Sequence, residues 1–439
     1  MKNLSTLTSN LPSPPKGGWG VWRHGALWLA LELILVTFAC WWAFDPVIVT
    51  NYVTHLPLGY DVDRMVKLDV AILTEGIAVN ELSDEEERLL QKVQEMDEVE
   101  MAYRAHNNPM GYNTITMPGY FFNDKGDSIE TQRYGFTQDS KMLEVYGIHS
   151  LTPSVPDSEL TRDCEWEKTV LFTRSLAMGL FGTIDVAGRN VLGMKYGWDE
   201  ESRTMGWHKE YFHIRAVVED VRYQTYDRNY ATLFYCASGM YSGVPIILRL
   251  REGVNAERFV QEHQKEIQDE MVTEHCYIRS IQTASEAKDE QSGAIFLERL
   301  TRRNLLIAAF FATNMAFGVL GTLLMYMRQR REEAGVKRAF GATRWSIFWG
   351  FIREAWLLTT ISVIIGCILF FQFASAKGLF TCGSHSNPAV HFWFDDFSTH
   401  FMVVSLFVYI IILCTVLLGT AIPAWRISRS KITESLREE

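Results

Sequence analysis

The stretch Arg328–Glu354, RQRREEAGVKRAFGATRWSIFWGFIRE, decides how the rest of this chain is interpreted. It is polar and basic at its start, and it separates two long apolar segments. Acidic residues at 332–333 and basic residues at 337–338 suit the dipole of a short helix, and Gly341 can supply the left-handed turn that ends it. We expect a short helix with a sharp stop, joined to two membrane spans and suited to binding another protein.

Four segments are apolar over about 19 residues or more, the length needed to cross a hydrocarbon core. They are residues 26–44, 305–327, 347–376 and 401–424. Tryptophans flank these segments, as expected where indole rings meet the membrane interface. The predicted fold is an integral membrane α-helical protein with four transmembrane helices and a large α+β extracytoplasmic domain between helices 1 and 2.

The first apolar segment has two interpretations, a cleaved signal peptide and an uncleaved anchor. Its basic residues lie far from a short hydrophobic core, and it ends in CWWAFDP rather than in small residues, which favours the anchor. Glu32 within this span is costly in lipid, so we expect it to face other helices or water. A role in the bundle interior is favoured over one in substrate binding.

Charge predicts the orientation in the membrane. The loop 328–346 holds six basic and two acidic residues, residues 1–25 hold three basic and no acidic ones, and the tail 425–439 holds four basic and three acidic ones. Because an excess of Lys and Arg marks the cytoplasmic side, both termini and this loop are expected inside. We predict a multi-pass protein of the inner (cytoplasmic) membrane with its large domain in the periplasm.

The expected organisation has ten consecutive parts, and residues 286–327 are expected to form one helix about 60 Å long. The parts are an interfacial or cytosolic segment (1–25), the first span (26–44), the extracytoplasmic domain (45–285), a stalk helix (286–304), the second span (305–327), a cytosolic coupling loop (328–346), the third span (347–376), an external loop (377–400), the fourth span (401–424) and a cytosolic tail (425–439).

The outer domain shows local signals of both helices and strands. Residues 83–86 resemble a capping box that opens a charged helix running to about residue 98. A strand at 168–172 leads into a helix at 174–181 that stops at Gly182. We expect two βα-type halves, at about 60–150 and 210–285, with an insert between them.

Motifs for catalysis and metal binding are absent from the sequence. It contains no Walker A phosphate loop, H-E-x-x-H, G-x-S-x-G or C-x-x-C. His385, His391 and His400 could bind a metal, but their spacing fits no known ligand pattern, so we interpret them as loop residues. We therefore expect no catalytic residues and no metal site. Four cysteines in the predicted outer segments could pair, although no short spacing indicates it; these are Cys164, Cys236, Cys276 and Cys382.

Four stretches carry a resemblance to a known family. REEAGVKRAFGATRWSIFWGFIREA at 331–355 resembles the signature of ABC-transporter permeases of the MacB/FtsX/LolC-LolE type, the four-span mechanotransmission permeases. VLFTRSLAMGLFGTIDVAGRNV at 170–191 and VVEDVRY at 217–223 look like outer-domain segments of the macrolide-exporter branch, and IPAWRISRSKITESLR at 422–437 resembles the family's ending. Ala334 replaces the usual Ile, and residues 431–433 replace a common Asp-Pro pair.

The resemblance implies a permease that works as a dimer with separate cytosolic ATPases, which bind the ATP and Mg, so this chain is expected to be no enzyme and to hold no cofactor. Seven residues would form the coupling element: Arg330, Glu333, Gly335, Lys337, Arg338, Gly341 and Ala342. Glu354 would brace the start of the third span.

Function and partners follow as expectations. MacB-like efflux, in which ATP hydrolysis moves the periplasmic domain and drives export or release of a substrate on the outer side, is favoured. The alternatives are an FtsX-like activator of a cell-wall hydrolase without transport, and a lipoprotein-release permease. Expected partners are the ATPase, a second permease chain (homodimer or heterodimer) and the lipid bilayer, with a periplasmic membrane-fusion protein and an outer-membrane channel as further candidates and no nucleic acid.

Overall fold

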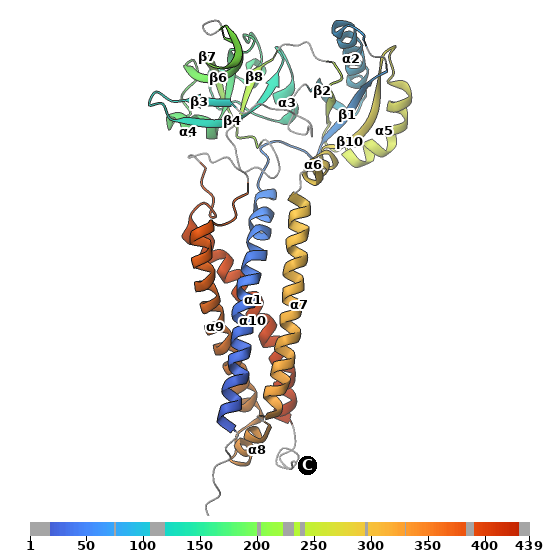
Figure 1. The fold of residues 1–439 in the computed structure, drawn as a ribbon. Coiled ribbons are helices and arrows are strands. Elements are labelled where there is room, and N and C mark those ends of the chain that lie inside the picture. Colours follow the sequence, from blue (N-terminus) through green and yellow to red (C-terminus); the bar gives the residue numbers. More distant parts are fainter. Residues whose placement is uncertain are drawn as a thin grey trace, which may run out of the picture. The chain divides into compact units, whose positions relative to one another are not determined.

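The structure, a computed structural model, describes residues 18–73, 76–105, 119–199, 203–222, 232–237, 242–294, 297–329, 331–382 and 390–429 (Figure 1). Contacts divide the chain into two compact units. The membrane unit comprises residues 1–49, 301–380 and 393–439, and the outer unit comprises residues 50–300 and 381–392.

Five helices contribute to the membrane unit: α1 (Gly18–Thr54), α7 (Leu297–Gln329), α8 (Arg331–Ala339), α9 (Arg344–Lys377) and α10 (Phe397–Arg429). Among the described residues, three helical segments are long and apolar enough to cross a membrane: Leu27–Thr54, Arg344–Lys377 and Phe397–Arg429. They cover the first, third and fourth expected spans. The second expected span lies within α7, a helix of 33 residues.

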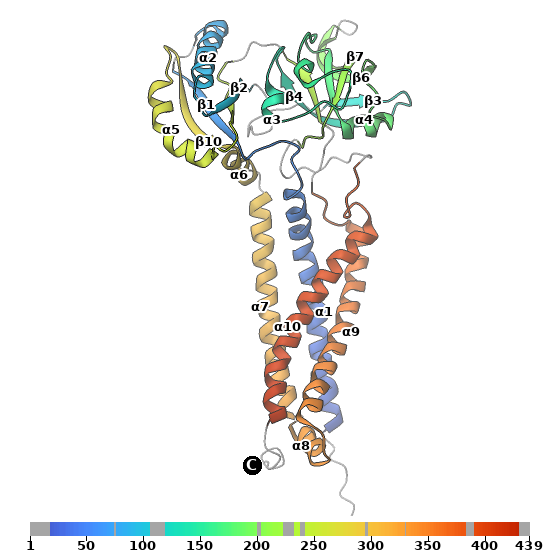
Figure 2. The ribbon, with the colours of Figure 1, turned by 180° about the vertical axis from the view of Figure 1, so that it is seen from behind.

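Helices α1, α9 and α10 pack around one apolar core (Figure 2). Trp41 of α1 is fully buried in it and stacks on Phe370 of α9, with ring centroids 4.2 Å apart. A close approach occurs at Gly366 of α9, where an added Cβ would lie 2.7 Å from Cβ of Thr37 and 3.1 Å from the carbonyl oxygen of Ile34. Small residues allow such contact between membrane helices, so Gly366 lets α1 and α9 approach each other closely.

A buried polar pair lies among the same helices. Nε2 of His400 in α10 lies 2.6 Å from Oδ1 of Asp45 in α1, and Nδ1 lies 3.1 Å from the carbonyl oxygen of Phe394. The backbone N–H of Phe380 donates to Oδ2 of the same aspartate, at 3.0 Å. Burial of polar groups requires such pairing. The histidine that the sequence places in a loop is therefore a packed residue of α10.

The outer unit contains a four-stranded antiparallel sheet in the order β10-β1-β9-β2. Its strands are β1 (Met65–Ile72), β2 (Val99–Arg104), β9 (Ile246–Leu250) and β10 (Cys276–Thr283). Two amphipathic helices, α2 (Val79–Gln94) and α5 (Ala256–Glu270), cover it and bury apolar residues in a shared core. Helix α6 (Ala284–Ala294) follows β10.

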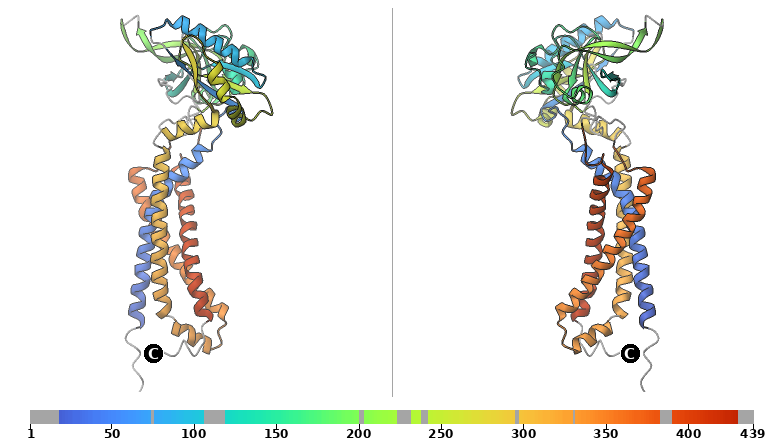
Figure 3. Two further views of the ribbon diagram at one scale, coloured as in Figure 1. Left: turned by 90° about the vertical axis from the view of Figure 1, so that its right-hand side faces the viewer. Right: turned by 90° about the vertical axis from the view of Figure 1, so that its left-hand side faces the viewer.

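A closed six-stranded barrel in the order β3-β4-β8-β5-β7-β6 forms the second part of the outer unit. Its strands are β3 (Gly119–Phe122), β4 (Ser128–Phe136), β5 (Thr169–Thr173), β6 (Asn190–Asp199), β7 (Thr204–Val218) and β8 (Thr232–Cys236); the helices α3 (Met142–Tyr146), η2 (Asp157–Glu159) and α4 (Arg174–Phe181) lie between them. Figure 3 shows the long β6–β7 hairpin extending away from the barrel. Gly182 ends α4 with a φ of 70°, as expected.

Two expectations for the outer domain are wrong. The predicted capping box at 83–86 lies inside α2, which begins at Val79 without a side-chain cap. Its acidic side chains bind tertiary partners instead, because Glu86 pairs with Arg104 and Glu85 with His275. The bounds of the two βα-type halves are also wrong, because the two β-α-β segments are β1-α2-β2 and β9-α5-β10, whereas residues 204–218 and 232–236 belong to the barrel. The continuous helix over 286–327 falls in part on residues 295–296, outside the described ones.

Candidate coupling site

Helix α8 ends in a tight turn made by its own backbone. Gly341 has a φ of 94°, a left-handed conformation that favours glycine. The N–H of Gly341 donates to the carbonyl of Arg338 at 3.0 Å, and the N–H of Ala342 donates to the carbonyl of Lys337 at 3.0 Å. This pair of bonds is the Schellman motif. The sharp helix stop predicted from the sequence is present.

The next helix begins immediately after this turn. Thr343 caps α9, because its side chain accepts a hydrogen bond from the N–H of Ser346 at 3.2 Å. Only Phe340, Gly341, Ala342 and Thr343 separate the last helical residue of α8 from the first of α9. Two capped ends this close leave the linker few free backbone groups, so α8 is held firmly to α9.

One side of α8 packs against the membrane unit. Ala334 is buried at 4% exposure in a cluster with Ile347 and Phe351 of α9 and Ala424 of α10. Ala342 is half-buried against the same cluster. A small residue at 334 lets the α8 backbone approach its neighbours, which gives the departure from the usual Ile a structural reason.

Further residues at the end of α8 and the start of α9 expose apolar and basic side chains. Phe340 is 89% exposed, Trp345 is 59% exposed and Val336 is 44% exposed. Lys337 lies beside them and is exposed. We call these four residues the α8 face. An exposed apolar cluster with a charged neighbour is typical of a protein-binding surface.

The predicted coupling residues divide into three groups in the structure. Lys337 and Gly341 are exposed, Arg338 and Ala342 are half-buried, and Gly335 is buried. Glu333 lies in α8, where its backbone is described, and Arg330 falls outside the described residues. The sequence reasoning missed Val336, Phe340 and Trp345. The signal that could have found them was apolar residues beside charged ones in a segment expected outside the membrane.

Two further predicted residues lie within the membrane unit. The carboxylate of Glu32 in α1 is half-buried and contacts Gly318 of α7, filling the space that a side chain at 318 would need. It therefore faces a neighbouring helix. Glu354 is half-buried within α9, beyond the first turns of that helix.

Comparison with known proteins finds a family match for the part of the chain that contains α8. Residues 305–432 match the family model described as FtsX-like permease C-terminal. These residues contain α8, the turn and α9. The chain therefore contains an FtsX-like permease domain and is similar to ABC-transporter permeases of the MacB/FtsX type.

Individual relatives match this permease over smaller parts. It is 35% identical over 63 residues to "Macrolide export ATP-binding/permease protein MacB" of Marinobacter nauticus, a match that covers 14% of this chain and 10% of the relative. The permease thus spans about a tenth of the length of that curated relative.

Solved structures of outer regions are similar at low TM-scores. The periplasmic region of MacB from Actinobacillus actinomycetemcomitans has a TM-score of 0.30 at 11% identity and covers 53% of this chain and 94% of its own. A domain of a putative permease protein from Porphyromonas gingivalis has a TM-score of 0.29 at 19% identity, and the match covers 52% of this chain and 92% of that domain.

Residues 217–222 of the VVEDVRY motif form a junction inside the outer unit of the permease. The buried Arg222 donates from Nη1 to the carbonyl oxygen of Val53 in the last turn of α1, at 2.5 Å. Asp220 accepts hydrogen bonds from the N–H of Ser175 at 2.6 Å and from its hydroxyl at 2.8 Å. The motif therefore joins the end of α1 to the start of α4.

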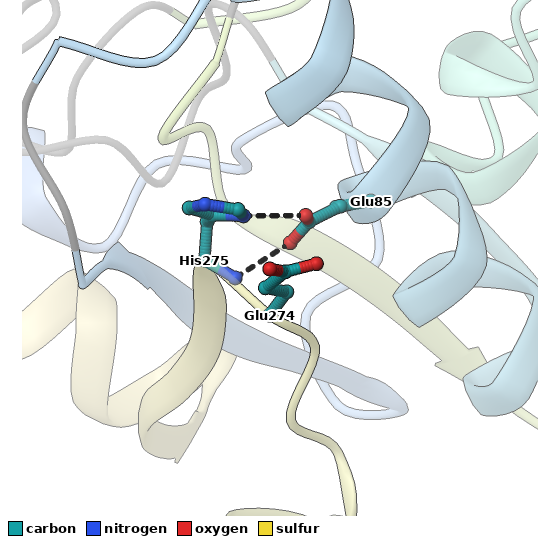
Figure 4. A group of neighbouring side chains, drawn as sticks. All are labelled: Glu85, Glu274 and His275. Atoms are coloured by element: carbon teal, nitrogen blue, oxygen red, sulfur yellow. Dashed lines mark hydrogen bonds and ion pairs between the residues drawn. The ribbon is translucent and has the colours of Figure 1, made fainter.

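Among the described residues, one group of neighbouring side chains could ligate a metal ion. It consists of Glu85, Glu274 and His275 (Figure 4). Glu85 already accepts from Nδ1 of His275 at 2.8 Å, from the N–H of that residue at 2.8 Å and from the hydroxyl of Thr273 at 2.6 Å. A metal ion would have to displace these hydrogen bonds. These hydrogen bonds join α2 to the segment before β10, and we call Glu85 and His275 with these bonds the clamp.

The outer unit also presents two surfaces without an assigned role. A pocket of about 490 Å³ lies between α2, β2 and residues 137–141, with a mostly polar lining. One face of the β6–β7 hairpin exposes large side chains in register, since Tyr196 pairs with Trp207 and Trp198 with Met205. Sequence reasoning did not single out this hairpin.

Proposed function

We propose that this chain is a four-span permease subunit that binds a separate cytosolic ABC ATPase through the α8 face. The observation that carries the proposal is the α8 turn itself, which is capped, packs Ala334 against α9 and α10, and exposes Val336 and Phe340. Its buried side contacts α9 and α10. A force applied by a partner to Phe340 or Val336 would therefore pass to two long helices rather than be lost in a flexible loop.

The remaining parts of the proposal follow from the permease family. ATP and Mg bind to the partner ATPase, this chain performs no catalysis, and α7 contains the second of the four spans. Helix α1 continues from the membrane unit to Thr54, and Arg222 binds its end. This continuity supports a mechanical connection from the inner side to an outer domain in the periplasm.

We further propose that the movement drives export or release of a substrate on the outer side of the inner membrane, with two permease chains per complex. A periplasmic membrane-fusion protein and an outer-membrane channel are further candidate partners in this proposal. Loss of efflux in a deletion strain supports this function. Retained efflux with lost activity of a wall hydrolase, or with retained lipoproteins, contradicts it.

The test of ATPase binding uses two changes on the α8 face. Phe340→Asp and Lys337→Glu should each lower recovery of the co-expressed ATPase on the tagged permease by about tenfold, the effect expected when an interface anchor or its charge is lost. Recovery is measured by quantitative immunoblotting in detergent.

Matched controls alter the same residue types on the outer unit. Tyr211 is 67% exposed and Lys125 is also exposed, so Tyr211→Asp and Lys125→Glu remove an exposed aromatic and reverse an exposed charge elsewhere. These controls should leave ATPase recovery unchanged. Equal recovery with the α8 variants and the controls would overturn the proposed binding face.

A further inference from the structure

Two thiols from distant parts of the chain lie together in the core of the outer unit. Cys164 follows η2, and Cys236 is the last residue of β8. They are 7% and 2% exposed and belong to one apolar cluster. The Sγ of Cys236 lies 3.6 Å from the carbonyl oxygen of Cys164, and the N–H of Glu167 donates to the carbonyl oxygen of Cys236 at 2.9 Å. The segment carrying Cys164 is thus held to the end of β8.

The two thiols also interact with each other. The side-chain hydrogen bond between them lowers the pKa of Cys236 and raises the pKa of Cys164. Since the thiolate is the reactive form of cysteine, Cys236 is the first to ionise. Cys276, also buried in the outer unit, differs because burial raises its pKa to about 11.

We propose that Cys164 and Cys236 are a redox pair that forms a disulfide when the permease is exposed to an oxidising disulfide compound. The contacts that bring the two thiols together all lie within the outer unit, so the pairing itself does not depend on the proposed function. Only the oxidised state expected in cells rests on the proposed function, which places this unit on the outer, disulfide-permissive side.

Disulfide formation between the two cysteines proceeds by thiol–disulfide exchange, with a reagent disulfide as the oxidant. The Cys236 thiolate attacks one reagent sulfur, the reagent S–S bond breaks, and the first reagent thiolate leaves. Cys164 then loses its proton and attacks the Cys236 sulfur of the mixed disulfide, which releases the second reagent thiolate. The two protons from the protein thiols go to the two leaving thiolates, so two protein thiols are oxidised while one disulfide is reduced to two thiols.

Burial of the two thiols determines how fast we expect them to be oxidised, and the disulfide should change the stability of the outer unit. Access to the pair requires the segment around Cys164 to open, and this segment is held by Thr161, whose hydroxyl donates to the carbonyl oxygen of Ser140 at 3.0 Å. Oxidation of the folded protein should therefore be slow. Once formed, the disulfide would close a loop of about 70 residues and raise the Tm of the outer unit by about 5–10 °C.

The experiment uses full-length permease in lipid nanodiscs, with five cysteines replaced by serine or alanine so that Cys164 and Cys236 remain. The protein is incubated with oxidised glutathione, quenched in acid, unfolded, alkylated with N-ethylmaleimide and weighed by intact mass spectrometry. A control that retains Cys236 and Cys276 receives the same treatment.

The expected product is a chain about 2 Da lighter that takes up no maleimide, and that takes up two after reduction. The control should keep both thiols or form glutathione adducts. Two maleimides per chain after prolonged oxidation, or a glutathione adduct that never resolves, would overturn the pair. A melting scan of the wild type, with and without reductant, checks that the bridged form is folded.

A cellular arm separates this inference from the proposed function. Wild-type protein is trapped in intact cells with maleimide and mapped at residues 164 and 236. Oxidised residues support the pair and its outer placement. Reduced residues in cells, together with closure in nanodiscs, would contradict the outer placement and the oxidised state in the cell while the pairing geometry stands.

Discussion

Glu85 shows how a single residue joins distant elements of the outer unit. It is buried in α2, and its carboxylate binds Thr273 and His275 just before β10. The hydrogen bond from Thr273, with further bonds from His275, lowers the pKa of Glu85 to about 2. The hydrogen bond to Glu85 raises the pKa of His275 above its ordinary 6.5.

This clamp makes the stability of the outer unit depend on pH. The Glu85 contribution is present above its ordinary pKa of 4.5 and is lost as pH falls towards 2. The His275 contribution is present below 6.5 and is lost as pH rises through the raised folded value. The clamp therefore stabilises most between about pH 4.5 and 6.5.

The Glu85→Gln variant should lower the Tm most within that window and progressively less on either side of it. Melting of the permease followed by intrinsic fluorescence from pH 3 to 9 measures this. The exposed Glu87 on the same helix provides the control Glu87→Gln. A pH-independent loss of Tm in Glu85→Gln would show that packing, and not the ionised pair, accounts for the effect.

Single residues also mark where sequence reasoning stops. Glu85 and Glu86 look like a capping box because the local pattern fits one, but their partners lie in β2 and in the segment before β10, far away in the sequence. Gly341 was correctly predicted, since a left-handed helix stop is a local property. Phe340 was not recognised, because its exposure depends on how α8 packs against α9 and α10.

At the scale of elements, length and apolarity predicted the membrane helices well. Segments near 26–44, 347–376 and 401–424 correspond to α1, α9 and α10. The barrel could not be predicted, because its closure depends on pairing between distant strands. Strand β4 pairs in parallel with β8, and β5 pairs in parallel with β7. Such contacts leave no short-range signal.

Packing between membrane helices gives a test at this scale. Gly366→Ala should place a methyl group against Thr37 and destabilise the membrane unit by about 1–3 kcal/mol, the usual cost of overpacking. Gly350 lies on the same helix with no atom within 4 Å of an added Cβ. Gly350→Ala should be neutral or stabilising by up to about 1 kcal/mol, because alanine favours helices.

Unfolding of both variants in mixed detergent and SDS, followed by tryptophan fluorescence, measures the difference. The expected order is Gly366→Ala below the wild type and Gly350→Ala at or above it. Equal stability of the two variants would mean that α1 and α9 do not approach each other closely at Gly366.

At the scale of the molecule, the permease contains a capped α8 turn in its membrane unit and an outer unit in which Arg222 binds the end of α1. The α8 turn contacts two long helices, and Arg222 binds the last turn of a third. We infer that a partner ATPase drives the chain through α8.

Photo-cross-linking in membranes tests this claim most directly. Benzoylphenylalanine is placed at Val336 or Phe340 on the α8 face, and at Leu406, which is 60% exposed on α10, as the control. After illumination with the co-expressed ATPase, positions 336 and 340 should give an adduct with the mass of permease plus ATPase, and position 406 should give none. The absence of that adduct at both α8 positions, with the complex otherwise intact, would contradict the account.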